Sequence, residues 1–272
     1  MSSVPKRVAE RLNKQVRKFQ SVLESAHKRD VNEADTVLII TDILSEVFGF
    51  DKYTEITSEQ AVRGTYCDLA VKLDGKIEYL IEVKAIGLSL KENHLRQALG
   101  YGANNGIPWV VLTNGLVWEL YRIKFEKPID YDKVMAFDYA QLNPRKLEDQ
   151  EQLYVLCKEG IAKAAIESYH ERAMCVNKYT IGAVLASDQI VDKIRVELRR
   201  LNRDVKVSSE EIAHILRSEV LKREVLEGDA AEQAAVKVKK SASKTLRKAK
   251  AKKTSQLVPG ESRPPMLIQD KQ

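Results

Sequence analysis

The chain has 272 residues, of which 44% are hydrophobic and 31% are charged, the balance of a soluble globular protein. No apolar run approaches the roughly 18 residues that a membrane span needs, and the opening residues lack the apolar stretch of a secretory signal. The three cysteines are far apart and none lies in a CxxC pair, which argues against a disulfide framework or a cysteine zinc site. This composition predicts a cytoplasmic protein without a membrane partner.

The net charge of +6 is concentrated near the C-terminus. Residues 237–253 hold nine Lys or Arg and no acid, and subtracting nine from +6 leaves −3 for the rest of the chain. We predict that residues 228–272, which are rich in Ala, Lys, Ser and Pro, form a disordered basic tail. Such a tail can hold nucleic-acid phosphates without sequence preference. The alternative interpretation is a solvated linker that binds nothing.

Apolar residues at helical spacing predict a leading helix within residues 1–30 and a second helix that begins after Asn32 and ends near Gly49. The period then changes to alternation, which is typical of strands. The expected strands are residues 53–57, 65–73, 77–86, 107–113, 116–123 and 134–137, with a helix over residues 91–104. We therefore predict an α/β domain over residues 31–146.

From Leu147 onward the alternating pattern stops and helical spacing returns. Ser208, followed by two glutamates, is typical of a helix start. We predict a helical region over residues 147–227. Its apolar positions are explained equally by internal packing, by a homo-oligomer interface or by docking of a partner protein.

The strands 65–73 and 77–86 form a hairpin whose register depends on its turn. The turn can contain two residues, Asp74 and Gly75, or three, with Lys76 added. A slip of one residue moves every side chain to the other face of the sheet. The three-residue turn is predicted because it places three apolar pairs on one face, namely Leu73–Ile77, Val71–Tyr79 and Leu69–Ile81.

This register places Asp68 directly opposite Glu82, with Lys84 on the same face. Facing residues on paired strands have Cβ atoms about 4.5–5.5 Å apart, and two carboxylates so close repel each other unless a cation lies between them. A hard divalent ion with oxygen ligands, Mg²⁺ or Mn²⁺, suits this position. Other charged residues of this hairpin are expected to line its solvent face.

At these residues the sequence resembles the PD-(D/E)XK nuclease superfamily, and more narrowly the N-terminal nuclease domain of type I restriction enzyme R subunits. The matching features are Asp68, the Glu82-Val83-Lys84 triplet, a following Gln97 and Tyr101 pair, and the segment 108–121. Cys67 stands where the family usually has proline. The resemblance covers roughly residues 30–125 and implies a restriction-endonuclease-like core, in which helices flank a mixed central β-sheet.

The same resemblance implies roles for these residues. Asp68, Glu82, the Val83 carbonyl and Glu33 would bind the metal, while Lys84 would assist the attacking water. Gln97 would act in catalysis, and the residues implied to contact substrate are Tyr101, Lys91 and Arg96. The R-subunit family also carries an ATP-driven motor, but the sequence contains no GxxxxGK[ST] phosphate loop.

Two functions follow as hypotheses. The first is metal-dependent hydrolysis of phosphodiester bonds, with DNA as the expected substrate, RNA left open, and a restriction or anti-phage setting. The second is a non-catalytic module that retains the nuclease fold and binds nucleic acid or supports an assembly.

Overall fold

The computed structural model describes residues 4–58, 67–204 and 206–255. These fall into two units, residues 1–173 and 174–272, so the boundary lies later in the chain than the expected one at residue 146. The positions predicted at 1–3, 65–66 and 256–272 lie outside the described residues. No helix in the described ranges is long and apolar enough to cross a membrane.

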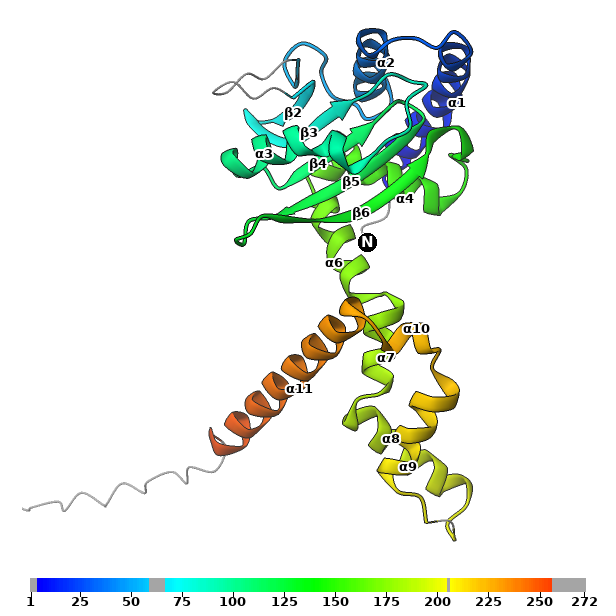
Figure 1. The fold of residues 1–272 in the computed structure, drawn as a ribbon, viewed down its shortest axis with the longest axis vertical. Coiled ribbons are helices and arrows are strands. Elements are labelled where there is room, and N and C mark those ends of the chain that lie inside the picture. Colours follow the sequence, from blue (N-terminus) through cyan, green and yellow to red (C-terminus); the bar gives the residue numbers. More distant parts are fainter. Residues whose placement is uncertain (1–3, 59–66, 205, 256–272) are drawn as a thin grey trace, which may run out of the picture. The chain divides into compact units, whose positions relative to one another are not determined.

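The first unit is built on a six-stranded mixed sheet with the strands in sequence order (Figure 1). Only β3 and β4 pair in parallel, which requires a crossover, and a short helical segment and α3 supply it. The strands are β1 (Ile56–Ser58), β2 (Leu69–Leu73), β3 (Lys76–Val83), β4 (Trp109–Thr113), β5 (Val117–Lys124) and β6 (Asp130–Asp138). The predicted α/β class with a mixed, helix-flanked sheet is confirmed.

Two separate cores cover the two faces of this sheet because strand side chains alternate between faces. The larger core joins α1, α2 and α4 to one face, and Tyr79 extends from β3 to donate a buried hydrogen bond to the Leu156 carbonyl at 3.1 Å. The smaller core packs α3 against the other face. The helices of this unit are α1 (Lys6–Lys28), α2 (Glu33–Glu46), η1 (Glu92–Leu95), α3 (Arg96–Asn105), η2 (Tyr139–Gln141), α4 (Leu147–Leu156), α5 (Lys158–Ile161) and α6 (Ala165–Cys175), the last of which runs past the unit boundary.

The β2–β3 hairpin has the predicted register at its deep end but not at its turn. Leu69 pairs with Ile81 and Val71 with Tyr79, as predicted. The turn contains two residues rather than three, because Asp74 and Gly75 both adopt positive φ angles, of 50° and 80°, as the tight hairpin turn requires. Leu73 therefore pairs with Lys76, and a bulge after Val71 restores the register toward the site.

The second unit is entirely helical in its described part. Its small core contains Val191, Ile212 and Leu216, and the predicted Ser208 cap accepts a hydrogen bond from the Glu211 amide at 3.1 Å. The elements are α7 (Lys178–Leu185), α8 (Asp188–Leu201), α9 (Ser209–Ile215), η3 (Leu216–Val220), α10 (Arg223–Leu226) and α11 (Asp229–Ser255).

The prediction of disorder from residue 228 is wrong for residues 229–255, which form α11. Alanine and lysine are strong helix formers, and Ala231 and Ala234 are buried on a helix that contacts α7. The basic segment therefore begins as a helix with one packed face. Its lysines at 237, 239, 240 and 244 are exposed.

Candidate functional site

The predicted site residues Asp68, Glu82 and Lys84 come together at the end of the β2–β3 hairpin. The Leu69–Ile81 pair fixes Asp68 beside Glu82, and the Asp68 Oδ2 atom accepts a hydrogen bond from the Val83 amide at 2.6 Å. Lys84 follows the last residue of β3, and its amide donates to the Thr113 carbonyl of β4 at 2.8 Å. The parallel β3–β4 pair thus holds the Glu82-Val83-Lys84 backbone in place.

The Lys84 ammonium contacts three oxygen atoms. Its Nζ atom lies 2.8 Å from Glu82 Oε1, 2.8 Å from the Val83 carbonyl oxygen and 3.3 Å from Glu33 Oε2. These three groups, together with Asp68, are the metal ligands that the family resemblance implies. The positive charge that occupies their meeting point in this structure is the ammonium of the chain's own lysine.

Helix α2 brings Glu33 to this point. Asn32 caps the helix by accepting a hydrogen bond from the Asp35 amide at 2.9 Å, as predicted. Glu33 is the first helical residue, where the helix dipole favours a negative charge. Its side chain is 48% exposed, so solvent weakens its interaction with Lys84 more than that of the buried Glu82.

The electrostatics favour a cation at this position. The Glu82 side chain is only 7% exposed, and burial raises the pKa of its carboxyl, an effect that the hydrogen bond from Lys84 opposes and the charge of Asp68 reinforces. Burial lowers the pKa of Lys84, but the hydrogen bond from Lys84 to Glu82 and the charges of Glu82, Asp68 and Glu33 together outweigh burial, so the net pKa is raised. Three carboxylates face one ammonium, which leaves an excess of negative charge.

Cys67, at the position where the family usually has proline, is buried and takes no charge. Burial, reinforced by the charges of Glu82 and Asp68, raises the pKa of its thiol to about 12. The thiol lies 3.1 Å from the Ile81 carbonyl oxygen and 3.3 Å from that of Leu69. It therefore serves as a small packing group between the strands and is not a nucleophile at neutral pH.

The other residues implied by the resemblance are not joined to this cluster. Gln97 is exposed on α3, and Tyr101, one turn later, is only 1% exposed and packs in the smaller core. Tyr101 thus lies beneath the surface, which contradicts its predicted contact with substrate. Lys91 and Arg96 are exposed, and among the described residues no hydrogen bond links either of them to the cluster.

Asn114 is a positioning residue in the turn between β4 and β5. Its Nδ2 atom donates to the Ile86 and Leu88 carbonyls at 3.3 and 2.9 Å, while its Oδ1 atom accepts from the Leu116 and Val117 amides. It thereby ties the loop after Lys84 to the β4–β5 turn. An Asn-Gly pair signals a turn equally well without these bonds, so sequence could not reveal them.

The donor set fits a hard divalent cation in its chemistry, since every group is an oxygen. The carboxylates lie farther apart than in a preformed metal centre. Within the described residues, no three His, Cys, Asp or Glu side chains are grouped closely enough to hold a metal ion. Two carboxylates and a backbone carbonyl meet at Lys84, and the third carboxylate, Asp68, bonds to the Val83 amide.

Comparison with known proteins adds no further assignment. No family model, no curated protein and no solved structure matches this chain.

Proposed function

We propose that the first unit has a restriction-endonuclease-like core and hydrolyses phosphodiester bonds in DNA in a metal-dependent reaction. The single observation that carries the proposal is the convergence of Glu82, the Val83 carbonyl and Glu33 on Lys84, with Asp68 one hydrogen bond away. A restriction or anti-phage setting accords with such an activity.

In this proposal Asp68, Glu82 and the Val83 carbonyl hold Mg²⁺ or Mn²⁺, with Glu33 as a further ligand. When bound, the metal supplies a Lewis acid that holds a phosphate oxygen and lowers the pKa of water. A divalent cation would compete with the Lys84 ammonium for the same oxygens. Lys84 then offsets negative charge on the phosphate and orients the attacking water.

The test is a cleavage assay on plasmid and oligonucleotide DNA and on RNA, with Mg²⁺, Mn²⁺ or EDTA. We expect cleavage with metal only, and a loss of about 100-fold or more in Asp68→Asn and Glu82→Gln, the scale seen when a group acting at the reacting centre is removed. The same hairpin supplies matched controls, Asp74→Asn and Glu78→Gln, which make the identical chemical changes near the turn and should leave cleavage unchanged.

Two results would reject this function. One is the absence of any cleavage across the metal series by a correctly folded sample. The other is cleavage that persists equally in Asp68→Asn, Glu82→Gln and their controls, because the activity would then arise elsewhere or from a contaminant.

A second candidate is a non-catalytic module that binds nucleic acid. The cation-rich helix α11 supports it, as does the ammonium of Lys84, which pairs with Glu82 and Glu33 in place of a metal ion. This candidate predicts binding without turnover, with an affinity that falls steeply with salt and weakens when Lys237, Lys240 and Lys244 are changed to glutamine.

A further inference from the structure

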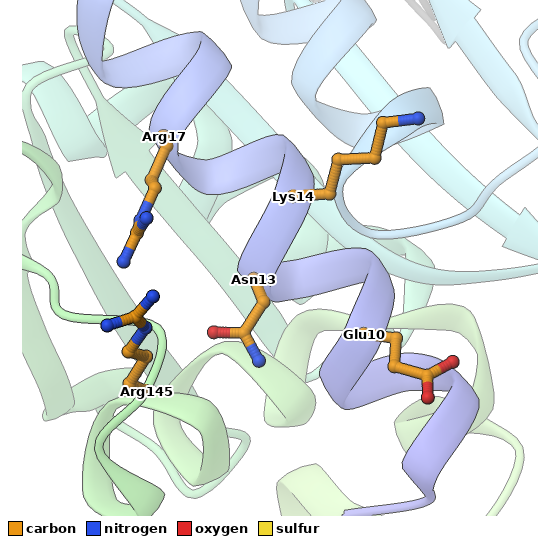
Figure 2. Close-up of a pocket in the computed structure, with 5 residues that line it drawn as sticks. All are labelled: Glu10, Asn13, Lys14, Arg17 and Arg145. Carbon is orange, nitrogen blue, oxygen red and sulfur yellow. The ribbon is translucent and has the colours of Figure 1, made fainter.

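A pocket of about 400 Å³ lies between α1 and the loop that precedes α4, and it shares no residue with the candidate site. Five residues line it, with three cations and one acid among them: Glu10, Asn13, Lys14, Arg17 and Arg145. Figure 2 shows the guanidinium groups of Arg17 and Arg145 directed toward each other, whereas Lys14 and Glu10 point away.

The helical repeat gathers the α1 side of this pocket on one surface. Residues 10, 13, 14 and 17 follow the i, i+3, i+4, i+7 spacing of a single helix face, and the buried residues of α1, such as Leu12 and Val16, occupy the opposite face. The basic face is therefore a consequence of the same amphipathic pattern that docks α1 on the sheet.

The loop that carries Arg145 is fixed against α1. Gln20, one turn after Arg17, donates from Nε2 to the carbonyls of Tyr139, Ala140 and Leu142 at 3.1, 3.3 and 2.8 Å. Further along, the Arg145 amide donates to Asn143 Oδ1 at 3.1 Å. The backbone that leads to Arg145 is therefore held by hydrogen bonds to α1 and within the loop.

The two arginines lack the carboxylate partner that their neighbour has. Arg11, on the same helix, forms a two-pronged ion pair with Glu159 at 2.6 and 2.7 Å. Within the described ranges neither Arg17 nor Arg145 forms an ion pair. Two guanidinium groups that converge without an acid repel each other, and an anion between them removes that repulsion.

A third polar group in the pocket is also without a partner. The Oδ1 atom of Asn13 is buried and makes no hydrogen bond in the described structure. The oxygen and nitrogen of an asparagine amide exchange places on rotation. Asn13 lines the pocket, so a rotation of its side chain toward the opening would present the amide N–H to an anion held by the arginines.

We propose that this pocket binds a backbone phosphate of a nucleic acid strand. Guanidinium groups match phosphate oxygens with paired hydrogen bonds, and both arginines are solvent-exposed. Sites for small molecules enclose most of their ligand, whereas an open pocket suits one phosphate of a long chain that continues outside it. The inference rests on the proposed function only in naming DNA as the polymer.

The test measures the binding of a fluorescently labelled DNA duplex by anisotropy in EDTA, so that no cleavage intervenes. We expect the Arg17→Ala/Arg145→Ala variant to bind roughly tenfold more weakly, because hydrogen bonds between a guanidinium and a phosphate are stronger than neutral ones. The slope of its log affinity against log salt concentration should also be shallower by about one for each arginine removed.

Matched controls separate a site from general charge. The Lys28→Ala/Lys52→Ala variant removes the same charge from the same unit, but at exposed lysines that already have acid partners, Glu24 and Asp42. It should weaken binding by less than about twofold. Arg17→Lys/Arg145→Lys keeps the charge but loses the paired geometry, and should fall between wild type and the alanine variant.

The DNA titrations overturn the inference if the wild type does not bind, if both alanine double variants weaken binding equally, or if the arginine-to-lysine variant is indistinguishable from wild type. A parallel titration with inorganic phosphate distinguishes the source of the ligand. If phosphate perturbs the arginine side-chain NMR signals while DNA affinity is unchanged in the alanine variant, the pocket takes a free anion and the proposal fails. If DNA binds at the arginines but the metal-series assay shows no cleavage, the proposed function is rejected and this inference is not.

Discussion

A lysine and a glutamate lie two residues apart at each end of strand β3, where Lys84 directly follows the last strand residue, and the two pairs differ in their surroundings. Near the turn, Lys76 and Glu78 lie 3.4 Å apart with side chains 77% and 22% exposed. At the deep end, Lys84 and Glu82 lie 2.8 Å apart and are 15% and 7% exposed. The residue types and spacing are the same, so burial and the added oxygen atoms of Glu33, Val83 and Asp68 separate a candidate site from an ordinary surface ion pair.

The difference has an energetic meaning. An exposed ion pair contributes little, because water solvates both charges and salt screens them. A buried pair contributes little net stability as well, but removing one partner leaves an uncompensated charge and is strongly destabilising. The deep pair should therefore respond to a single substitution much more than the turn pair does.

The largest expected effect is on stability. In EDTA, Lys84→Ala should lower the free energy of unfolding by about 3 kcal/mol, because Glu82 loses its cation, whereas Lys76→Ala should change it by less than about 0.5 kcal/mol. Urea titrations followed by tryptophan fluorescence report on the first unit specifically, since both tryptophans, Trp109 and Trp118, are buried in its strands. Equal effects of the two substitutions would remove the distinction between the ends of β3.

The next effect is rescue by metal. If a divalent cation and the Lys84 ammonium compete for the same oxygens, Lys84→Ala should gain more stability from Mg²⁺ than wild type does. A ligand that binds only the folded state at about 100 times its Kd stabilises by about 2.7 kcal/mol. The measurement is the shift in urea midpoint between EDTA and Mg²⁺, with Lys76→Ala as the control that should match wild type. An identical Mg²⁺ shift in all three proteins would argue against a metal at these oxygens.

The two ends of the hairpin also show what sequence can and cannot predict. The pairing of Leu69 with Ile81 was predictable because a slip would have exposed apolar side chains. The two-residue turn was missed although Asp-Gly favours it, because the apolar pairs were matched over the whole hairpin without the bulge that the structure contains. The bulge after Val71 then shifts the register by one residue. The shorter turn and the bulge therefore offset each other, and the strand pairing next to Asp68 is the one predicted.

Tertiary contacts account for what was missed elsewhere. Glu33 was placed at the site by resemblance, and only the packed start of α2 brings it to Lys84. Tyr101 shares the QxxxY spacing, and so a helix face, with the exposed Gln97, yet Tyr101 is buried because its part of α3 packs in the smaller core of the sheet. Arg145 meets Arg17 only through a loop that Gln20 holds, a contact with no signature in either local segment.

The smallest expected effect is the dependence of stability on pH. Burial raises the pKa of the Glu82 carboxyl above its usual 4.5, and Lys84 offsets part of that shift. The native state therefore binds the proton more tightly than the unfolded chain does. The stability that this group contributes is complete below pH 4.5 and is lost as the pH rises through the raised native pKa.

Wild type should accordingly lose stability relative to Glu82→Gln, which cannot ionise, as the pH is raised from 4 to 8 in EDTA. Glu78→Gln makes the same chemical change near the turn and controls for other effects along the strand. Because Lys84 lowers the pKa of Glu82, the loss should be larger in a Lys84→Ala background. A difference that stays flat would mean that the pKa of Glu82 is the same in the native and unfolded chains, and one that grows in favour of wild type would mean that Lys84 lowers it below its usual value. Either result would contradict the effect of burial argued for this end of β3.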